Sequence, residues 1–154
     1  MNLSFCDIKK TSINDINVLE KEAYHNLINF QEVSKNFISK IEGLSLKSEE
    51  YIGHIYAYKA ADQADIISFV IKEKFRKQNF GTLLFKAFMS NLTIYGVKDV
   101  FLEVSEKNIV AQKFYYRLGF KNVGYRKDYY KEKNGKLGAY LFKTKIKNTL
   151  WKVN

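Results

Sequence analysis

The sequence contains no proline and only one cysteine, Cys6. A lone cysteine cannot form a disulfide within the chain, and it is typical of a protein from a reducing compartment. The two histidines, His25 and His54, lie in unrelated segments without metal-ligand spacing. The sequence therefore predicts no metal site, no disulfide scaffold and no recognisable cysteine–histidine catalytic pair.

Long hydrophobic runs are also absent. No apolar stretch approaches the roughly 20 residues that a membrane-spanning helix needs, and the start of the chain, MNLSFCDIKK, lacks the pattern of a signal peptide. We therefore expect a cytoplasmic protein with no membrane partner. A hydrophobic fraction of 46% excludes a disordered chain, and the 154 residues fit one domain over positions 1–154.

Arginine is scarce as well: Arg76, Arg117 and Arg126 are the only ones, so the formal net charge of +10 comes mostly from lysine. The lysines are scattered, which is typical of a solvated surface. The alternative is a polyanionic partner such as coenzyme phosphates or ribosomal RNA. A basic RNA- or ribosome-binding module is the non-enzymatic alternative. No helix-turn-helix, RNA-binding aromatic motif or zinc-ligand set supports it, and we expect no direct nucleic-acid role.

The apolar pattern predicts a mixed α/β fold. Strands are predicted over Leu3–Ile8, Leu44–Leu46, Tyr51–Tyr58, Ala64–Ile71, Val97–Val104, Phe120–Tyr130 and Gly138–Lys147. Helices are predicted over about 16–24, 30–41 (ended by Gly43), 80–95 (closed by Gly96) and 108–118. The near-continuous apolar run Ala64–Ile71 favours a strand buried on both faces. A turn at Asn134-Gly135 suggests that the last two strands form a hairpin.

The segment RKQNFG, Arg76–Gly81, joins a predicted strand to the longest predicted helix. Free backbone N–H groups at a helix start can bind a phosphate, and Gly81 would let the backbone approach it closely. Asn79 tolerates left-handed geometry and can stand in for a second glycine. Further side-chain donors are available from Arg76, Lys77 and Thr82. Taken alone, the segment is also typical of an ordinary basic helix cap.

Residues 102–120, LEVSEKNIVAQKFYYRLGF, favour the phosphate site over the ordinary helix cap. Together with FRKQNFGTLL they resemble the paired coenzyme motifs of the GNAT superfamily of acetyltransferases. The first family motif is Arg or Gln, two residues, Gly, one residue, then Gly or Ala; Arg76 and Gly81 match it, and Asn79 replaces the middle glycine. Asn108, Ala111, Tyr115 and RKDYY at Arg126–Tyr130 are similar to the RimI-type ribosomal-protein-alanine acetyltransferases.

The resemblance implies a GNAT-like single domain, with a mixed, mostly antiparallel sheet of about seven strands and about four helices. It also implies an N-acetyltransferase that uses acetyl-CoA and no metal to acetylate a primary amine, such as the N-terminus of a ribosomal protein. Backbone groups of Phe69, Val70 and Ile71 would then hold the pantetheine arm and polarise the thioester carbonyl. The implied coenzyme-binding residues are Phe69, Val70, Ile71, Arg76, Lys77, Gln78, Asn79, Phe80, Gly81, Thr82 and Asn108.

Direct acetyl transfer needs a general base for the amine and a proton donor for the departing thiolate. Glu103 is the predicted base, because it lies on the strand face opposite Leu102 and Val104. Tyr115 is the predicted acid, beside the apolar stripe of its helix. An exposed strand glutamate and a core tyrosine are the alternatives. The resemblance places Tyr129 and Tyr130 in the acceptor groove, where cross-strand packing is the alternative, and Asn108 is predicted to cap its helix.

Two departures from the RimI-type pattern concern the acceptor. Leu137 and Gly138 occupy positions where an acidic pair is usual, and the Pro-Trp element is missing. An α-amine titrates near 7.7–8.0 and a lysine near 10.4, which favours an N-terminal acceptor at neutral pH. A small-molecule amine or a lysine side chain stays open as the acceptor. A coenzyme-binding protein without catalysis is a further alternative, which the presence of both Glu103 and Tyr115 disfavours.

Overall fold

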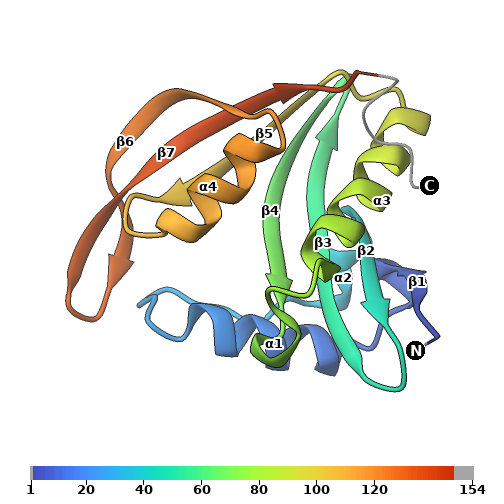
Figure 1. Ribbon diagram of the computed structural model, residues 1–154. Helices are drawn as coiled ribbons and strands as arrows, with labels where there is room; N and C mark the ends of the chain where they lie inside the picture. Colours follow the sequence, from blue (N-terminus) through green and yellow to red (C-terminus); the bar gives the residue numbers. More distant parts are fainter. Residues whose placement is uncertain (1, 148–154) are drawn as a thin grey trace.

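The computed structural model describes residues 2–147 and contains one seven-stranded sheet in the order β1-β2-β3-β4-β5-β7-β6 (Figure 1). The strands are β1 Ser4–Asp7, β2 Glu42–Lys47, β3 Tyr51–Ala60, β4 Gln63–Ile71, β5 Asp99–Ser105, β6 Lys121–Glu132 and β7 Gly135–Lys145. The α-helices are α1 Ile13–Tyr24, α2 Lys35–Ile38, α3 Phe80–Ile94 and α4 Ile109–Arg117. Among the strands of the described residues, β4 and β5 alone pair in parallel, which confirms the predicted mixed, mostly antiparallel fold.

Two hydrophobic cores lie on opposite faces of the sheet. Helices α3 and α4 cover the larger one, whose fully buried rings include Phe85, Phe88, Phe120 and Phe142. Helices α1 and α2 cover the other face with smaller clusters around Ile16, Leu19 and Ile38. Fully burying an aliphatic or aromatic side chain stabilises the fold by about 1.5–3 kcal/mol, so the α3–α4 face supplies most of the packing energy.

Strands β4 and β5 separate part of the way along the sheet. Their parallel pairing covers only Gln63–Ile66 with Asp99–Leu102, and beyond it the strands diverge (Figure 1). A β-bulge accompanies this separation: Ala57 pairs with Ile66 and Tyr56 with Ser68, so Ile67 is the extra residue. The gap between the two strands is the feature that positions the candidate site.

The bulge also reverses the side-chain alternation of β4. Ala64 and Ile66 belong to the larger core, and Phe69 packs against the same core at an odd spacing from them. Val70 instead packs with Leu19 of α1 on the opposite face. The prediction that Ala64–Ile71 is buried on both faces is therefore wrong. The strand alternates in burial, and the extra residue makes its pattern look continuous in sequence.

The predicted helix over 30–41 is also wrong, apart from the single turn of α2. The Asn17 side chain exchanges two hydrogen bonds with the Val33 backbone, at 3.1 and 2.8 Å, and Ser34 then caps α2. Gly43 lies inside β2 and ends no helix, and a Cβ there would come within 2.6 Å of the Ile55 carbonyl oxygen. Specific side-chain contacts thus replace the helix that the apolar spacing predicted.

The remaining predicted elements occur close to their expected positions. Ser12 caps α1, and Gly96 follows α3 with a φ of 75°. The last two strands form the predicted hairpin, with the turn at Lys133–Asn134 and Gly135 (φ 137°) opening β7. Within residues 2–147, no helix has the length and apolar character that crossing a membrane requires.

Candidate active site

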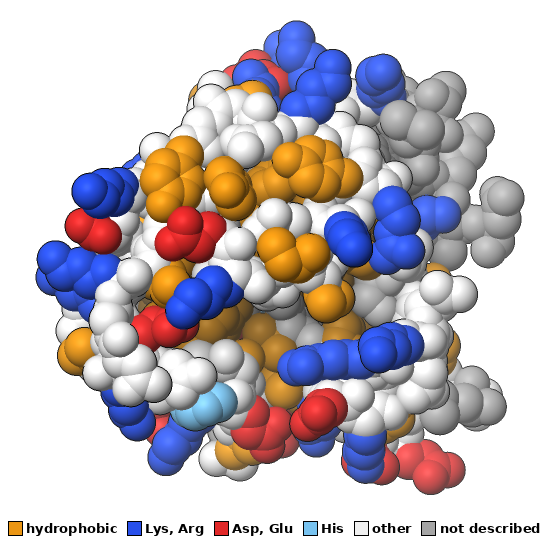
Figure 2. Space-filling view, turned by 60° about the vertical axis from the view of Figure 1, so that its left-hand side comes forward, with side chains coloured by type: hydrophobic (Ala, Val, Ile, Leu, Met, Phe, Trp, Pro, Cys, Tyr) orange, Lys and Arg blue, Asp and Glu red, His pale blue; other side chains and the backbone are white. Residues whose placement is uncertain are grey.

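A cavity of about 580 Å³ opens where β4 and β5 separate. Six elements and two loops contribute to its wall, which includes Tyr24, Leu27, Ser68, Phe69, Glu103, Asn108, Tyr115, Tyr130, Glu132 and Leu137. Figure 2 shows hydrophobic side chains inside a depression whose rim has both basic and acidic residues. The cavity therefore combines an apolar floor with a few polar groups, as ligand sites usually do.

Glu103 and Tyr115, the two predicted catalytic residues, both line this cavity. The Glu103 side chain is 25% exposed, and its Oε1 lies 3.5 Å from Nη2 of Arg126. The Arg126 guanidinium also lies over the Tyr129 ring, 5.5 Å from its centroid. Glu103 is thus a partly buried carboxylate with a cationic partner, on the part of β5 that β4 has left.

Tyr115 is 7% exposed and is both a core residue and a cavity residue. Its ring packs among aromatic neighbours that include Phe85, Phe120 and Phe142. Burial raises the pKa of the Tyr115 phenol far above its ordinary value, and charge on the nearby Tyr24 or Tyr130 would raise it further. The phenol is therefore a hydrogen-bond donor that keeps its proton throughout the physiological range.

Of the two predicted acceptor residues, Tyr130 lines the cavity, whereas Tyr129 is exposed outside it. The two rings meet edge to face with centroids 4.9 Å apart. The pairing of β6 with β7 is irregular between Arg126 and Tyr130, where Asp128 has a φ of 55°. This irregularity gives Tyr129 and Tyr130 different orientations. Tyr130 pairs across the hairpin with Leu137, another cavity residue. The acceptor side is therefore an apolar and phenolic wall.

Gly138 has a packing role that sequence reasoning did not find. Its N–H donates to Oε1 of Glu106 at 2.7 Å, and the Tyr125 hydroxyl donates to Oε2 of the same carboxylate at 2.8 Å. These two hydrogen bonds hold the pKa of Glu106 below its usual value. A Cβ at position 138 would lie 2.0 Å from the Tyr125 hydroxyl, so Tyr125 excludes a side chain there.

The segment Arg76–Thr82 forms the tight start of α3 and does not line the cavity. Lys77 and Asn79 both have left-handed φ values, 59° and 64°, which confirms the expected geometry of Asn79. Asn79 is the N-cap of α3, yet its side chain makes no capping bond. Within residues 2–147, no side chain caps the first N–H groups of α3, which are therefore available to an anion.

The other predicted residues of this segment support the turn. The Arg76 Nε donates to the Ile71 carbonyl at 2.9 Å, and the Gln78 amide donates to the Lys74 carbonyl at 2.8 Å. Phe80 packs edge to face on Phe75 with ring centroids 5.9 Å apart. Thr82 lies in the first turn of α3. The turn is thus held by its own side chains.

Gly81 lies against β4, but the protein itself does not require a glycine there. A Cβ at position 81 would lie 3.6 Å from the Phe69 ring and 4.0 Å from the Phe114 ring, which are ordinary contact distances. Packing therefore does not explain this glycine, unlike Gly138. Close approach of a ligand to the backbone would explain it.

The three predicted backbone residues of β4 divide into two groups. The Lys72 N–H donates to the Ile52 carbonyl at 2.9 Å, so residue 72 belongs to a hydrogen-bonded pair with β3. In an antiparallel ladder such pairs occur at every second residue, so residue 70 belongs to the next one. The backbone groups of Val70 are therefore turned toward β3, and its side chain is buried under α1. Those of Phe69 and Ile71 face the gap beside β5. The structure thus turns the backbone of Phe69 and Ile71 toward the gap and that of Val70 away from it; of the three, Phe69 lines the cavity, and the Ile71 carbonyl accepts from Arg76.

Asn108 caps α4 as predicted, because its Oδ1 accepts from the Ala111 N–H at 3.0 Å, and it also lines the cavity. Sequence reasoning missed Tyr24 and Ser68 in the cavity wall. The spacing of Glu20 and Tyr24, four residues apart on α1, was the available signal that both lie on one helix face. No group of three or more potential metal-ligating side chains occurs among residues 2–147.

The model of the acetyltransferase (GNAT) family matches residues 14–120. The [ribosomal protein bS18]-alanine N-acetyltransferase of Haemophilus ducreyi is 31% identical over 74 residues, which cover 48% of this chain and 51% of that protein, so the match spans about half of its length. The crystal structure of the ribosomal-protein-S18-alanine N-acetyltransferase from Escherichia coli has a TM-score of 0.79, covering 98% of this chain and 100% of that one at 19% identity.

Arabidopsis thaliana NAA60 in complex with acetyl-CoA has a TM-score of 0.76 at 18% identity, covering 94% of this chain and 99% of that one. These two structures share the fold described above. The family match covers more than half of the chain, including both segments that suggested a coenzyme site. The chain belongs to the GNAT family of acetyltransferases.

Proposed function

We propose that this protein moves an acetyl group from acetyl-CoA directly to a primary amine bound in the β4–β5 cavity. One observation carries the proposal: the uncapped, left-handed start of α3 adjoins a strand whose backbone faces a gap, and the same gap exposes Glu103 and Tyr115. The first feature suits a pyrophosphate, and the second suits an extended thioester arm beside an acid and a base.

On the coenzyme side, the N–H groups at the start of α3 would bind the pyrophosphate, and Lys77 and Arg76 add positive charge. The residues proposed to form this phosphate site are Arg76, Lys77, Gln78, Asn79, Phe80, Gly81 and Thr82. The gap-facing backbone of Phe69 and Ile71 would hold the pantetheine arm, with Asn108 opposite. Val70 contributes only packing here, because its backbone faces β3. Bound acetyl-CoA supplies a thioester whose carbonyl the amine attacks.

On the amine side, Glu103 would accept the proton that an ammonium must lose before it can attack. The carboxylate is partly exposed, pairs with Arg126 at 3.5 Å and lines the cavity. The raised pKa of Tyr115 limits its role as a full proton donor, because an ordinary thiol titrates near 8.5. Tyr115 is therefore best suited to stabilise the departing thiolate by a hydrogen bond, with complete proton transfer following later.

The N-terminal amine of a protein, including a ribosomal protein as in the Haemophilus ducreyi relative, is the proposed acceptor. Its low pKa favours it over a lysine side chain. Leu137 and Tyr130 give the acceptor wall an apolar character that suits a small first residue. A small-molecule amine or a lysine side chain is the alternative, and Leu137 and Gly138 are the residues that keep it open.

Two measurements test this function. Calorimetry with acetyl-CoA should show binding that weakens with salt, and acetylation of an alanine-initiated peptide should exceed that of spermidine, glucosamine and Nα-blocked lysine. Turnover of a small amine without turnover of the peptide would show that the acceptor is a small amine and not a protein N-terminus. A protein that binds no acetyl-CoA would refute the function altogether, and salt-sensitive RNA binding in its place would support the non-enzymatic alternative.

A further inference from the structure

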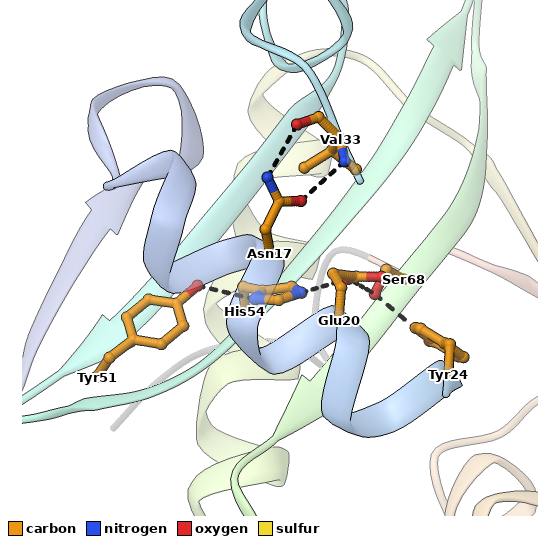
Figure 3. Close-up of polar contacts among 7 residues, drawn as sticks. All are labelled: Asn17, Glu20, Tyr24, Val33, Tyr51, His54 and Ser68. Atoms are coloured by element: carbon orange, nitrogen blue, oxygen red, sulfur yellow. Dashed lines mark hydrogen bonds and ion pairs between the residues drawn. The ribbon is translucent and has the colours of Figure 1, made fainter. Parts of the chain in front are cut away.

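A chain of polar side chains runs through the smaller core between α1, β3 and β4 (Figure 3). The Tyr51 hydroxyl lies 2.8 Å from Nδ1 of His54, and Nε2 of His54 lies 2.6 Å from Oε1 of Glu20. The Ser68 hydroxyl donates to the same carboxylate oxygen. The Tyr24 hydroxyl lies 3.4 Å from the Ser68 Oγ. Five side chains from three elements therefore form one continuous hydrogen-bonded path.

The carboxylate at the centre of this path is almost inaccessible to water. Glu20 is 5% exposed and His54 is fully buried. Burying a carboxylate is costly unless it is hydrogen-bonded, and a leucine at position 20 would fill the same helix position without that cost. Glu20 accepts from both Ser68 and His54, so its negative charge is compensated by donors. Packing alone does not require this arrangement.

One end of the path reaches the cavity. Tyr24 and Ser68 both line it, and the Ile67 bulge is the reason that Ser68 faces α1 and Glu20. Burial and the charge on Glu20 raise the pKa of Tyr24 to about 12, while its hydrogen bonds with the Ser68 side chain and the Phe69 backbone lower it. Tyr24 is therefore a neutral phenol at the Phe69 peptide group, where the thioester arm is proposed to lie.

The hydrogen bonds in the path have one direction. Because Ser68 donates its only hydroxyl proton to Glu20, Tyr24 must donate to Ser68. The Tyr24 oxygen can then accept a proton from the cavity while its own proton moves to Ser68 and the Ser68 proton moves to Glu20. One proton leaves the amine and one arrives at Glu20, which continues to accept a hydrogen bond from His54.

We propose that Tyr24, Ser68, Glu20 and His54 form a proton relay that removes the proton of the acceptor amine, in parallel with Glu103. The inference rests on the proposed acetyl transfer in this cavity. Tyr24 touches the substrate, and Ser68, Glu20 and His54 act through it. The relay gives the cavity two routes for the same proton, one on β5 and one through α1.

Other ionisable groups also face the relay. Tyr56 of β3 stacks on the His54 ring with centroids 5.5 Å apart, and burial and the charge on Glu20 raise its pKa. Burial, followed by the charges on Asp15 and Glu20, raises the pKa of Tyr51. These phenols stay neutral below pH 10.

The test compares Tyr24→Phe and Glu20→Gln with the native protein, using acetyl-CoA and an alanine-initiated peptide from pH 6 to pH 10. We expect each variant to lower kcat about twofold at pH 6.5, because the Glu103 route remains, and to approach the native rate above about pH 9, where the α-amine is already deprotonated. The peptide KM should change less than kcat. Thermal melting will show whether each variant is folded, and Tyr24→Phe keeps the test open should Glu20→Gln fail to fold.

Asn17→Ala is the matched control, because Asn17 lies on the same helix and anchors it to Val33 outside the relay. It should lower stability while leaving the shape of the pH profile unchanged. A loss of rate that is equal at every pH in Tyr24→Phe would overturn the relay and assign the path a structural role. If the native protein binds acetyl-CoA but acetylates neither the peptide nor any of the small amines, the proposed function fails and the relay fails with it.

Discussion

The proposed coenzyme side of the cavity is made largely of main-chain groups from neighbouring stretches of sequence, whereas the acceptor side is made of side chains from distant segments. Phe69 and Ile71 offer backbone groups, and the start of α3 offers N–H groups within about ten residues of them. Tyr24, Glu103 and Tyr130 come from α1, β5 and β6. A backbone site tolerates many sequences, but a side-chain site changes with each substitution.

The acceptor side also depends on a long-range backbone contact. Leu27 forms an isolated bridge with Glu132, and the Ile28 N–H donates to the Lys131 carbonyl at 2.9 Å. This contact joins the loop after α1 to the end of the last hairpin. Changes in either segment should therefore alter the acceptor without altering coenzyme binding, and the following predictions test that separation.

The largest expected effect is that of the double variant Glu103→Gln with Glu20→Gln. Removing both proton routes should lower kcat about 1000-fold, because general-base catalysis as a whole contributes 10²–10⁴, whereas Glu103→Gln alone should lower it only about twofold, because the second route remains. Acetyl-CoA affinity, measured by calorimetry, should stay within about threefold of native. A double variant no slower than either single one would mean that the two carboxylates act on a single route.

A second effect concerns alkaline stability, which should be limited by the face that contains Tyr24. The folded pKa of about 12 is above the ordinary value near 10, so the contribution is fully present below pH 10 and is lost as pH rises toward 12. The free energy of unfolding should fall by about 1.4 kcal/mol per pH unit for this group. Urea titrations at pH 9 to 11 should show a shallower decline in Tyr24→Phe, and parallel curves would contradict the assignment.

A smaller effect is expected at Gly81 on the coenzyme side. Gly81→Ala should weaken acetyl-CoA binding about 10-fold, or about 1.4 kcal/mol, by placing a methyl group where the pyrophosphate approaches. Its melting temperature should stay near native, because the new Cβ would meet Phe69 at 3.6 Å. Gly138→Ala is the control with the opposite expected outcome: it should destabilise the protein by displacing Tyr125 while leaving coenzyme affinity unchanged.

The smallest effect is expected at Asn79. Asn79→Ala should cost about 1 kcal/mol of stability, because a left-handed φ of 64° disfavours a residue with an ordinary Cβ. Asn79→Gly should be as stable as native or slightly more so, and it should bind acetyl-CoA equally well. Denaturation with urea, together with calorimetry, measures both. Equal stability of the alanine and glycine variants would show that the turn relaxes to another geometry.

The same contrast explains what could be predicted from sequence. The order of strands and helices, the Asn108 cap and the left-handed Asn79 follow from local patterns, and the structure confirms them. The meeting of Glu103 with Tyr115 in one cavity was suggested by a family resemblance, since their spacing alone does not bring them together. The Asn108 cap and the Asn79 turn could be predicted because each depends on residues that are neighbours in the sequence.

Failures of prediction occur where contacts between distant residues decide the structure. The residues after α1 do not form a helix, because Asn17 and Glu132 bind them in an irregular path. The side chains of β4 change faces after Ile67 because one extra residue is inserted there, and a near-continuous apolar run does not reveal an insertion. The location of Ser68 beside Glu20 has the same cause and was equally inaccessible to a reading of spacing.

The inserted Ile67 therefore has an influence out of proportion to its size. Deleting it would restore regular alternation, turn the residues that follow to the opposite side of the sheet and separate Ser68 from the carboxylate it serves. The Phe69 ring would then leave the larger core under α3 and α4 and face the smaller core under α1 and α2. A loss of three nucleotides at this codon would thus spare nearly every residue of the cavity and yet leave it unable to assemble.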